Sequence, residues 1–235
     1  MELIPSDLSK HRQQIEEYGF VVMPGIFEEH QLTRLAESLA TASLRRSRAG
    51  VRHALGNAVV RSLANDGPLV AAARYILGAN AFPFRATMFE KTQEANWLVV
   101  WHQDTALPLR HRRETPGWGP WSVKEDVIYA HAPASALAQV LALRVHLDDS
   151  TSRNGPLRVL PATHTVGVLS DDAIHQLAQD IVPVECCVPR GGIVAMKPLA
   201  VHSSSKSQSE CARRVLHIEY AENTTIAGNL ELAVA

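Results

Sequence analysis

The chain lacks the features that mark secreted, membrane-spanning or disulfide-rich proteins. Its 235 residues include three cysteines, Cys186, Cys187 and Cys211, an odd number without the spacing of a zinc site or a disulfide framework. No apolar run is long enough to cross a bilayer, and no basic stretch followed by an apolar one marks a signal peptide. We therefore expect free thiols in a cytoplasmic protein.

The chain also carries little net charge. The formal value is −1 at pH 7, so the composition gives no support for a nucleic-acid or membrane partner. A hydrophobic share of 46% and a charged share of 20% are those of an ordinary globular protein. A chain of this length can bury one good core, and we see no repeat or linker. The sequence predicts a single domain over residues 1–235 and leaves the oligomeric state open.

The hydrophobic pattern changes character near residue 78. Before it, leucines recur at helical spacing from residue 28 to about 45, and Pro68 opens a further helix that Gly78 ends. After it, a helix is expected only at about 171–180. The other segments are short and rich in branched residues, as strands are; they cover residues 20–27 in the first part and 84–90, 97–101, 140–147, 157–160, 192–196 and 215–220 in the second.

Helices first and strands afterwards predict a mainly β fold with flanking helices. We expect a helical N-terminal part, about 1–78, and a jelly-roll core of the double-stranded β-helix or cupin-like type, about 79–225. Residues 107–138 fit regular structure least, because they combine Arg110, Arg112 and Arg113 with Trp118, Trp121 and several prolines and glycines. Two readings stay open for this segment: a lid or substrate loop, or a solvated loop whose tryptophans fold onto the barrel.

The most informative run is Trp101-His102-Gln103-Asp104-Thr105. In an extended strand, side chains two positions apart leave the same face, so His102 and Asp104 point together while Gln103 points away. A nitrogen and an oxygen ligand on one face suit a divalent first-row metal such as iron(II).

A third ligand has to come from another segment, and His202 follows a second apolar, strand-like run. Two histidines and one carboxylate form the facial triad of non-haem iron oxygenases, which leaves metal positions open for a co-substrate and O2. The other histidines that compete for this role are assigned to loops or sheets; they are His111, His131, His146, His164, His175 and His217.

Two arginines, Arg213 and Arg214, lead into the last apolar strand. A dicarboxylate co-substrate needs a cation at the far end of its pocket, and the planar fork of arginine suits it. An arginine that enters a barrel is costly without an anionic partner, so one of the two is expected to bind a carboxylate and the other to lie in solvent.

Taken together, these motifs resemble the phytanoyl-CoA dioxygenase family of iron(II)- and 2-oxoglutarate-dependent oxygenases. The similarity lies in residues 17–27, 96–97, 101–105, 147–149, 154–161, 192–202 and 213–217. It implies a double-stranded β-helix in which His102, Asp104 and His202 bind iron. It also implies that Arg213, eleven positions beyond His202, and Ser204 bind the distant carboxylate of 2-oxoglutarate. Where many members have Pro-Gly-Ser-His, this chain has Ala162 and Thr163 in the middle positions, which alters the turn but removes no ligand.

The resemblance predicts an enzyme that uses Fe(II), 2-oxoglutarate and O2 to hydroxylate, or otherwise oxidise, a C–H bond of a small-molecule metabolite, releasing succinate and CO2. Related halogenases have a small residue where this chain has Asp104, so the carboxylate favours hydroxylation. Two alternatives remain: a cupin-type metal enzyme that does not use 2-oxoglutarate, and a silent small-molecule-binding protein on the same scaffold. Lys91 and Gln139 are either polar contacts in the pocket or ordinary strand-surface residues.

Overall fold

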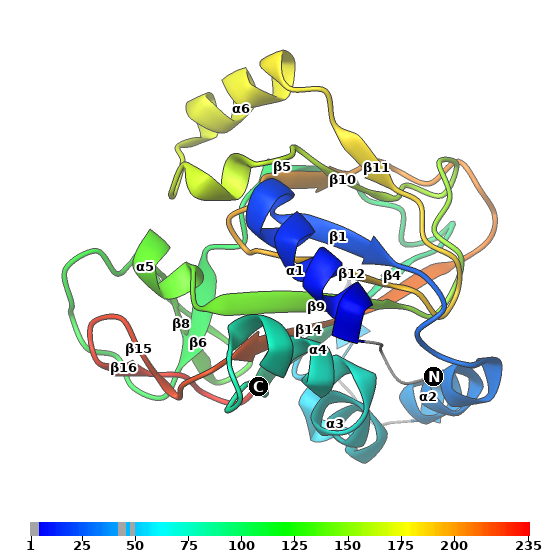
Figure 1. The fold of residues 1–235 in the computed structure, drawn as a ribbon, viewed down its shortest axis with the longest axis horizontal. Helices are drawn as coiled ribbons and strands as arrows, with labels where there is room; N and C mark the ends of the chain where they lie inside the picture. Colours follow the sequence, from blue (N-terminus) through cyan, green and yellow to red (C-terminus); the bar gives the residue numbers. More distant parts are fainter. Residues whose placement is uncertain (1–4, 42–45, 48–49) are drawn as a thin grey trace.

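Two antiparallel β-sheets face each other in the core of the molecule (Figure 1). The computed structural model describes residues 5–41, 46–47 and 50–235. The larger sheet has the order β1 (Phe20–Met23), β12 (Ile193–Met196), β9 (Val140–His146), β14 (Arg213–Ala221), β4 (Phe82–Lys91), β3 (Gly50–Val51) and β2 (Arg46–Ser47). The smaller sheet has the order β11 (Val184–Cys186), β10 (Leu157–Val159), β13 (His202–Ser204) and β5 (Val99–His102). This is the predicted jelly-roll arrangement.

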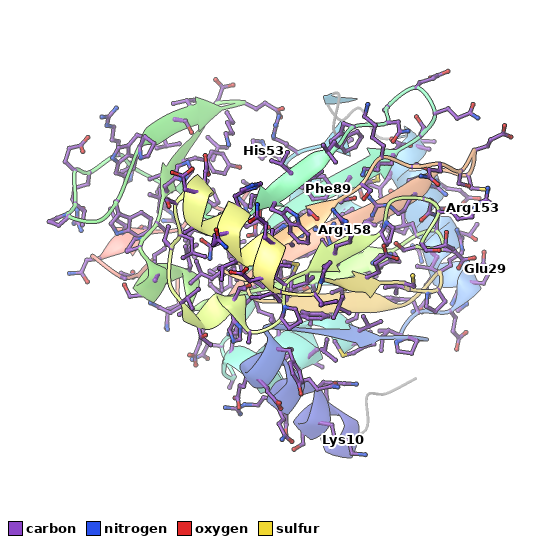
Figure 2. The ribbon with its side chains drawn as sticks, turned by 90° about the horizontal axis from the view of Figure 1, so that it is seen from above. Lys10, Glu29, His53, Phe89, Arg153 and Arg158 are labelled. Carbon is purple, nitrogen blue, oxygen red and sulfur yellow. The ribbon has the colours of Figure 1, made fainter. Side chains whose placement is uncertain are left out.

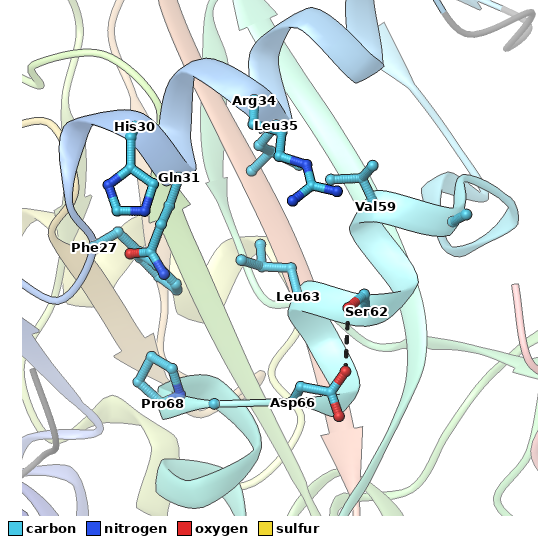
Figure 3. A pocket seen from close by; sticks show the side chains of 12 residues that line it. Phe27, His30, Gln31, Arg34, Leu35, Val59, Ser62, Leu63, Asp66 and Pro68 are labelled. Carbon is cyan, nitrogen blue, oxygen red and sulfur yellow. Dashed lines mark hydrogen bonds between the residues drawn. The ribbon is translucent and has the colours of Figure 1, made fainter.

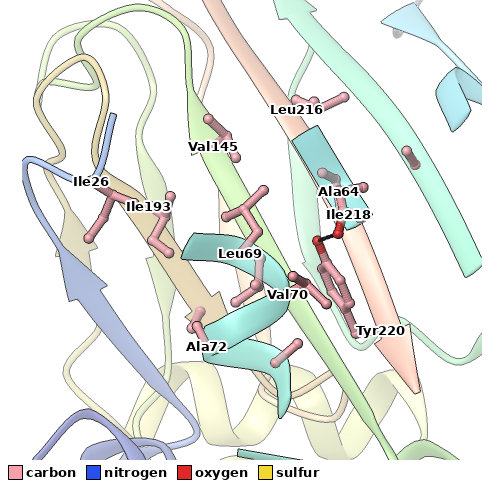
Figure 4. Close-up of a cluster of buried hydrophobic side chains, with 14 of the residues drawn as sticks. Ile26, Ala64, Leu69, Val70, Ala72, Val145, Ile193, Leu216, Ile218 and Tyr220 are labelled. Atoms are coloured by element: carbon pink, nitrogen blue, oxygen red, sulfur yellow. Dashed lines mark hydrogen bonds between the residues drawn. The ribbon is translucent and has the colours of Figure 1, made fainter. Parts of the chain in front are cut away.

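Four helices cover the outer face of the larger sheet: α1 (Pro5–Tyr18), α2 (Glu29–Thr41), α3 (Ala58–Asn65) and α4 (Pro68–Leu77). Figure 4 shows this packing, in which Leu69 and Val70 of α4 meet side chains of β9 and β14. The Tyr220 hydroxyl at the end of β14 donates a hydrogen bond of 2.9 Å to the Ala64 carbonyl of α3. The outer face of the sheet is therefore a dry, apolar layer.

The predicted helices of this region are largely confirmed. Pro68 is the first residue of α4, and Gly78 caps its end with a φ of 137° that favours glycine. The end predicted for α2 near residue 45 falls outside the described residues. The sequence analysis missed α3, although Asn57 caps it by accepting hydrogen bonds from the backbone nitrogens of Val59 at 2.9 Å and Val60 at 3.2 Å.

The helix predicted at about 171–180 is α6 (Asp171–Asp180), which lies on the outer side of the smaller sheet (Figure 1). Ser170 caps it by accepting a hydrogen bond of 3.3 Å from the nitrogen of Ala173. Its buried Ile174 packs with Leu160, Val201 and the partly buried Trp101. The helix therefore covers the back of the strands that carry the predicted histidine ligands.

The strands predicted for the second part of the chain are confirmed within a few residues. One detail was wrong: His202 does not end a strand that includes residues 198–201, because those residues form a turn and His202 opens β13. The N-terminal part is also more than helical, since β1 pairs with β12 along the edge of the larger sheet.

Residues 107–138 contradict the expectation of an irregular insertion. They form most of a three-stranded sheet, β6 (Ala106–Leu109), β8 (Val127–His131) and β7 (Trp121–Lys124), followed by α5 (Ala134–Leu137). A two-residue turn joins β7 to β8, and its residues Glu125 and Asp126 have φ values of 49° and 64°. Such turns usually carry glycine or asparagine, so this hairpin gives a weak sequence signal.

The tryptophans of this segment pack onto the barrel, as in the second of the two readings. Trp118 is buried and Trp121 is partly buried against a cluster that includes Leu107, Leu109 and Leu137. The short strands β15 (Thr225–Ile226) and β16 (Leu230–Glu231) complete this end of the molecule (Figure 1).

Candidate active site

The three predicted metal ligands meet between the two sheets. His102 ends β5 and His202 begins β13, and the two residues are direct partners in the pairing of these strands. Asp104 follows β5, with its backbone nitrogen donating a hydrogen bond of 2.9 Å to the Pro198 carbonyl. One ligand atom of each residue lies within 4.8 Å of the others, and no other such group of at least three residues was found in the part of the chain that the structure describes.

Both histidines are oriented by the same local bond. Each Nδ1 lies 2.9 Å from the carbonyl oxygen two residues earlier, at Val100 for His102 and at Ala200 for His202. The two Nε2 atoms therefore face Asp104, at 3.6 Å from Oδ1 and 3.5 Å from Oδ2. A histidine that donates from one nitrogen to a carbonyl presents the other nitrogen's lone pair to a metal.

The charge states of His202 and Asp104 suit a metal as well. Burial lowers the pKa of His202 to about 3 against the opposing attraction of Asp104, so its ring is neutral. Burial raises the pKa of Asp104, but the two histidines outweigh this effect and hold it well below its usual range. Neutral imidazole and ionised carboxylate are the forms that bind a divalent cation.

Gln103 points away from the triad, as predicted, and ties its loops together. Its Nε2 donates to the carbonyls of Leu199 at 2.8 Å and Gly167 at 2.9 Å, while its Oε1 accepts from the nitrogen of Leu169 at 2.9 Å. This buried amide joins the segment that carries Asp104 to the turn that precedes His202, so it fixes the distance between two of the three ligands.

The other predicted residues, Arg213 and Ser204, lie together at one end of the same cavity. Arg213 is 4% exposed, and its Nη2 donates to the Ser204 hydroxyl at 3.3 Å. Lys91 pairs with Arg213 across β4 and β14, is 1% exposed, and donates to the same hydroxyl at 2.7 Å. The Ser204 hydroxyl donates in turn to the Gly155 carbonyl at 2.8 Å. A Cβ on Gly155, whose φ is 68°, would lie 2.2 Å from the Ser205 carbonyl oxygen, so this close approach requires glycine.

The neighbouring Arg214 has a different role. Its Nε and Nη2 donate to the two oxygens of Asp148 at 2.8 and 2.7 Å, in a bidentate pair on the outside of the barrel. Arg213 has no such carboxylate, and its buried Nε has no hydrogen-bond partner among the described residues. Arg213 therefore lies inside the barrel, whereas Arg214 is not free in solvent, as expected for one of the two, but is partly buried and paired with Asp148.

The inner end of the cavity is strongly cationic. Burial, reinforced by Arg144, lowers the pKa of Arg213 to about 10. Burial and the nearby Arg213 and Arg144 lower the pKa of Lys91 to about 7. Buried cations without an anion cost folding free energy, so the arrangement is favourable only when an anionic ligand occupies it.

The three triad residues line the same cavity, of about 90 Å³, as Lys91, Ser204 and Arg213. Phe89, which Figure 2 labels near the middle of the molecule, forms part of its wall. Arg144 also lines the cavity, although it was not among the residues predicted from the sequence. The sequence of β9 does indicate that Arg144 and His146 share one face, because they alternate with the apolar residues that face the helices. Such alternation usually indicates that the polar face lies in solvent, so it did not predict a cavity.

Other candidate residues lie elsewhere. Gln139 donates to the Ser135 carbonyl at 2.9 Å and does not line the cavity. Arg110 and Arg112 form exposed ion pairs with Glu231 and Glu114. Of the competing histidines, His146 and His217 lie on the sheet, whereas His175 lies on α6 rather than in a loop or a sheet.

A larger hollow of about 490 Å³ lies between α2, α3 and α4 (Figure 3). Its polar side chains include His30, Arg34 and Asp66, and Asp66 accepts a hydrogen bond of 3.1 Å from Ser62. It contains none of the three triad residues, so its size alone does not make it the catalytic site.

Comparison with known proteins shows the family of this chain. The profile of the phytanoyl-CoA dioxygenase (PhyH) family matches residues 15–215. The chain belongs to this family. A curated relative, L-proline trans-4-hydroxylase from Streptomyces griseoviridis, is 26% identical over 180 residues, which cover 65% of this chain and 59% of the relative.

Solved structures of similar fold include two whose bound groups are named. EctD from S. alaskensis with bound Fe has a TM-score of 0.69 and 18% identity over 96% of this chain and 79% of its own. The epimerase SnoN in complex with Fe3+, alpha ketoglutarate and nogalamycin RO has a TM-score of 0.70 and 19% identity over 96% and 87%. These likenesses confirm the double-stranded β-helix.

The chain spans about three fifths of the length of the curated relative. The family's name is that of a dioxygenase, and the triad of His102, Asp104 and His202 offers a metal site that suits one. Within the described residues, no helix combines the length and apolar character needed to span a membrane.

Proposed function

We propose that this protein hydroxylates, or otherwise oxidises, a C–H bond of a small-molecule metabolite, with release of succinate and CO2. The observation that carries the proposal is a single cavity with His102, Asp104 and His202 on one side and Arg213, Ser204 and Lys91 at one end. The name of the curated relative, a hydroxylase of L-proline, supports oxidation of a small metabolite.

The donor set fits iron. Two imidazole nitrogens and one carboxylate are the ligands that non-haem iron enzymes use, with positions left open on the metal. His102, Asp104 and His202 would hold the ion, and the hydrogen bonds to Val100 and Ala200 would keep the two rings turned toward it. When bound, iron and 2-oxoglutarate supply the oxidising chemistry; the protein supplies orientation and a dry pocket.

The cationic end fits a dicarboxylate. Arg213 brings a guanidinium whose Nε lacks a partner, and Ser204 brings a hydroxyl already held by Gly155. Lys91 adds a second buried cation beside them. A carboxylate of 2-oxoglutarate would neutralise this end and remove the cost of burying its charges. A metal enzyme that does not use 2-oxoglutarate would leave these groups without a ligand.

The decisive experiment is anaerobic titration of the metal-free protein with Fe(II) and 2-oxoglutarate. The expected result is the visible metal-to-ligand charge-transfer band of the chelate, lost in His202→Ala and kept in His175→Ala, which alters an exposed helix residue. Admitting O2 should then release succinate. Iron binding without the band would support the cupin-type alternative, and binding of neither component would support a silent scaffold.

We further propose that residues 1–235 work as one domain in the cytoplasm. The pairing of β1 with β12 and the packing of α1–α4 on the larger sheet support one domain. The three cysteines are unpaired, which suits a reducing compartment. Limited proteolysis and fractionation of producing cells test the two statements; a stable separate N-terminal fragment would contradict the first, and export would contradict the second.

A further inference from the structure

A third arginine, Arg144, faces the cavity from the middle of β9. It is 7% exposed, and its guanidinium lies 5.4 Å from the centroid of the Phe89 ring. Its Nη1 donates to Nδ1 of His217 at 3.0 Å. Stacking on one side and a hydrogen bond on another hold the guanidinium in one orientation.

Arg144 lacks an anionic partner of its own. It forms no ion pair among the described residues, and its buried Nε has no hydrogen-bond partner. The one carboxylate that lines the cavity is Asp104, which belongs to the triad. A buried guanidinium with unused donors, aimed into a cavity, is favourable only if a ligand brings an anion to it.

The strand register places Arg144 away from the cationic end formed by Arg213. Arg144 pairs with His217 on β14, and Arg213 lies four residues earlier on that strand. Four residues of strand span about 13 Å, so the two arginines enter the cavity from different positions along the sheet, although Arg144 is near enough for its charge to lower the pKa of Arg213 and Lys91. Of these two arginines, Arg144 is the one near enough to Asp104 for the carboxylate to oppose the lowering of its pKa by burial. It therefore lies on the metal side.

We propose that Arg144 binds the carboxylate of 2-oxoglutarate that lies beside the metal, while Arg213 and Ser204 bind the distant carboxylate. This inference rests on the proposed function. It makes Arg144 a second, independent anchor of the co-substrate, with His217 and Phe89 as the residues that position it.

Binding of two different acids distinguishes the role of Arg144 from that of Arg213. 2-Oxopentanoate has the same 2-oxo acid end as 2-oxoglutarate but a methyl group in place of the distant carboxylate. Binding of each acid to the Fe(II)-loaded protein is measured without O2, by calorimetry and by the charge-transfer band. Arg144→Met should weaken both acids by a similar factor of at least about tenfold, since the variant removes one partner of a buried charge pair. Arg213→Met should weaken 2-oxoglutarate and leave 2-oxopentanoate nearly unchanged.

The matched control is Arg214→Lys, the neighbouring arginine outside the cavity, which should bind both acids as the unchanged protein does. If Arg144→Met does not fold, Arg144→Lys serves in its place, because it keeps the charge but loses the planar fork. Unchanged affinity for both acids in a folded Arg144 variant would overturn the inference while leaving the proposed function standing. Failure of the unchanged, iron-loaded protein to bind either acid would instead overturn the proposed function, and the inference with it.

Discussion

The two faces of the larger sheet are both buried, but one is apolar and the other carries polar and charged side chains. On the outer face, Leu141, Leu143 and Val145 of β9 pack against helices in an apolar layer. On the inner face the same strand presents Arg144 and His146, and β14 presents Arg213, His217 and Glu219. Apolar burial stabilises the fold, whereas buried charge costs stability unless it is paired. The comparison indicates that the outer face holds the protein together and that the inner face is organised for a ligand.

Some charged groups on the inner face do have partners within the protein. Glu219 forms an ion pair with Arg85, and its other oxygen lies 4.0 Å from Nε2 of His217. Arg85 also donates to the Ala106 carbonyl at 2.8 Å. On the inner face of the larger sheet, the buried nitrogens without a hydrogen-bond partner belong to Arg144, His146 and Arg213, and the two arginines line the cavity. The unsatisfied charge is thus concentrated where a ligand would bind.

The largest effect is expected on the inner face from Asp104→Ala. Among the described residues, Asp104 is the only carboxylate that lines the cavity, so its removal should abolish substrate-independent formation of succinate from 2-oxoglutarate. Because the pKa of Asp104 lies well below its usual range, its charge contributes to stability, so the unfolding midpoint should also fall. Asp180→Ala, at the exposed end of α6, is the control that should retain activity. Normal succinate formation by Asp104→Ala would remove this residue from the proposed metal site.

On the outer face, Leu143→Ala is expected to lower stability and to leave ligand binding unchanged. This fully buried side chain packs against the helical layer, and its truncation should lower the free energy of unfolding by about 2–5 kcal/mol. Urea unfolding measures the loss. The affinity of the folded variant for Fe(II) and 2-oxoglutarate should stay within about twofold of the original, since the Leu143 side chain lies on the face of the sheet opposite to the cavity. A large loss of affinity at full folding would break the separation between the two faces.

A smaller effect is expected at His146, which is fully buried on the inner face with no hydrogen-bond partner at either ring nitrogen. Burial, with the nearby Arg144 and Arg213, lowers its pKa to about 3. The unfolded chain, where the histidine pKa is about 6.5, therefore binds a proton that the folded protein does not, and stability falls as the pH drops from about 6.5 toward 3.

His146→Leu should remove this dependence. The slope of unfolding free energy against pH between about 4 and 6 should decrease by up to about 1.4 kcal/mol per pH unit. Urea unfolding at a series of pH values measures it. The variant should be at least as stable as the original at pH 7, because an apolar side chain replaces unsatisfied polar atoms. An unchanged slope would show that other groups dominate acid unfolding.

The smallest effect concerns Lys91, whose pKa is about 7. The charged form attracts a carboxylate, so affinity for 2-oxoglutarate should be greatest below pH 7 and decline by about tenfold as the pH rises through 7 to about 8.5. Anaerobic calorimetry with Fe(II) at saturating concentration measures this profile. Lys91→Met should bind more weakly but with a flat profile. A decline of equal size in the variant would assign the titration to another group.

Much of the fold could be predicted from local pattern. The helices α4 and α6 carry their own start signals, Pro68 and Ser170, and the strands β4, β9 and β14 are long apolar runs. The hairpin at residues 121–131 was missed because its turn, Glu125–Asp126, lacks the residues that usually mark it. Burial by Trp118 and its neighbours stabilises the segment instead.

By itself, the sequence determined the chemistry of the site. The spacing of His102 and Asp104 and the apolar runs around them are local, so the triad and Arg213 could be proposed from the residues and their resemblance to a family. Only the tertiary structure decided what surrounds them. Whether Arg144 and Lys91 face solvent or a cavity depends on a second sheet lying across the first, and strand alternation alone cannot distinguish water from a polar interior.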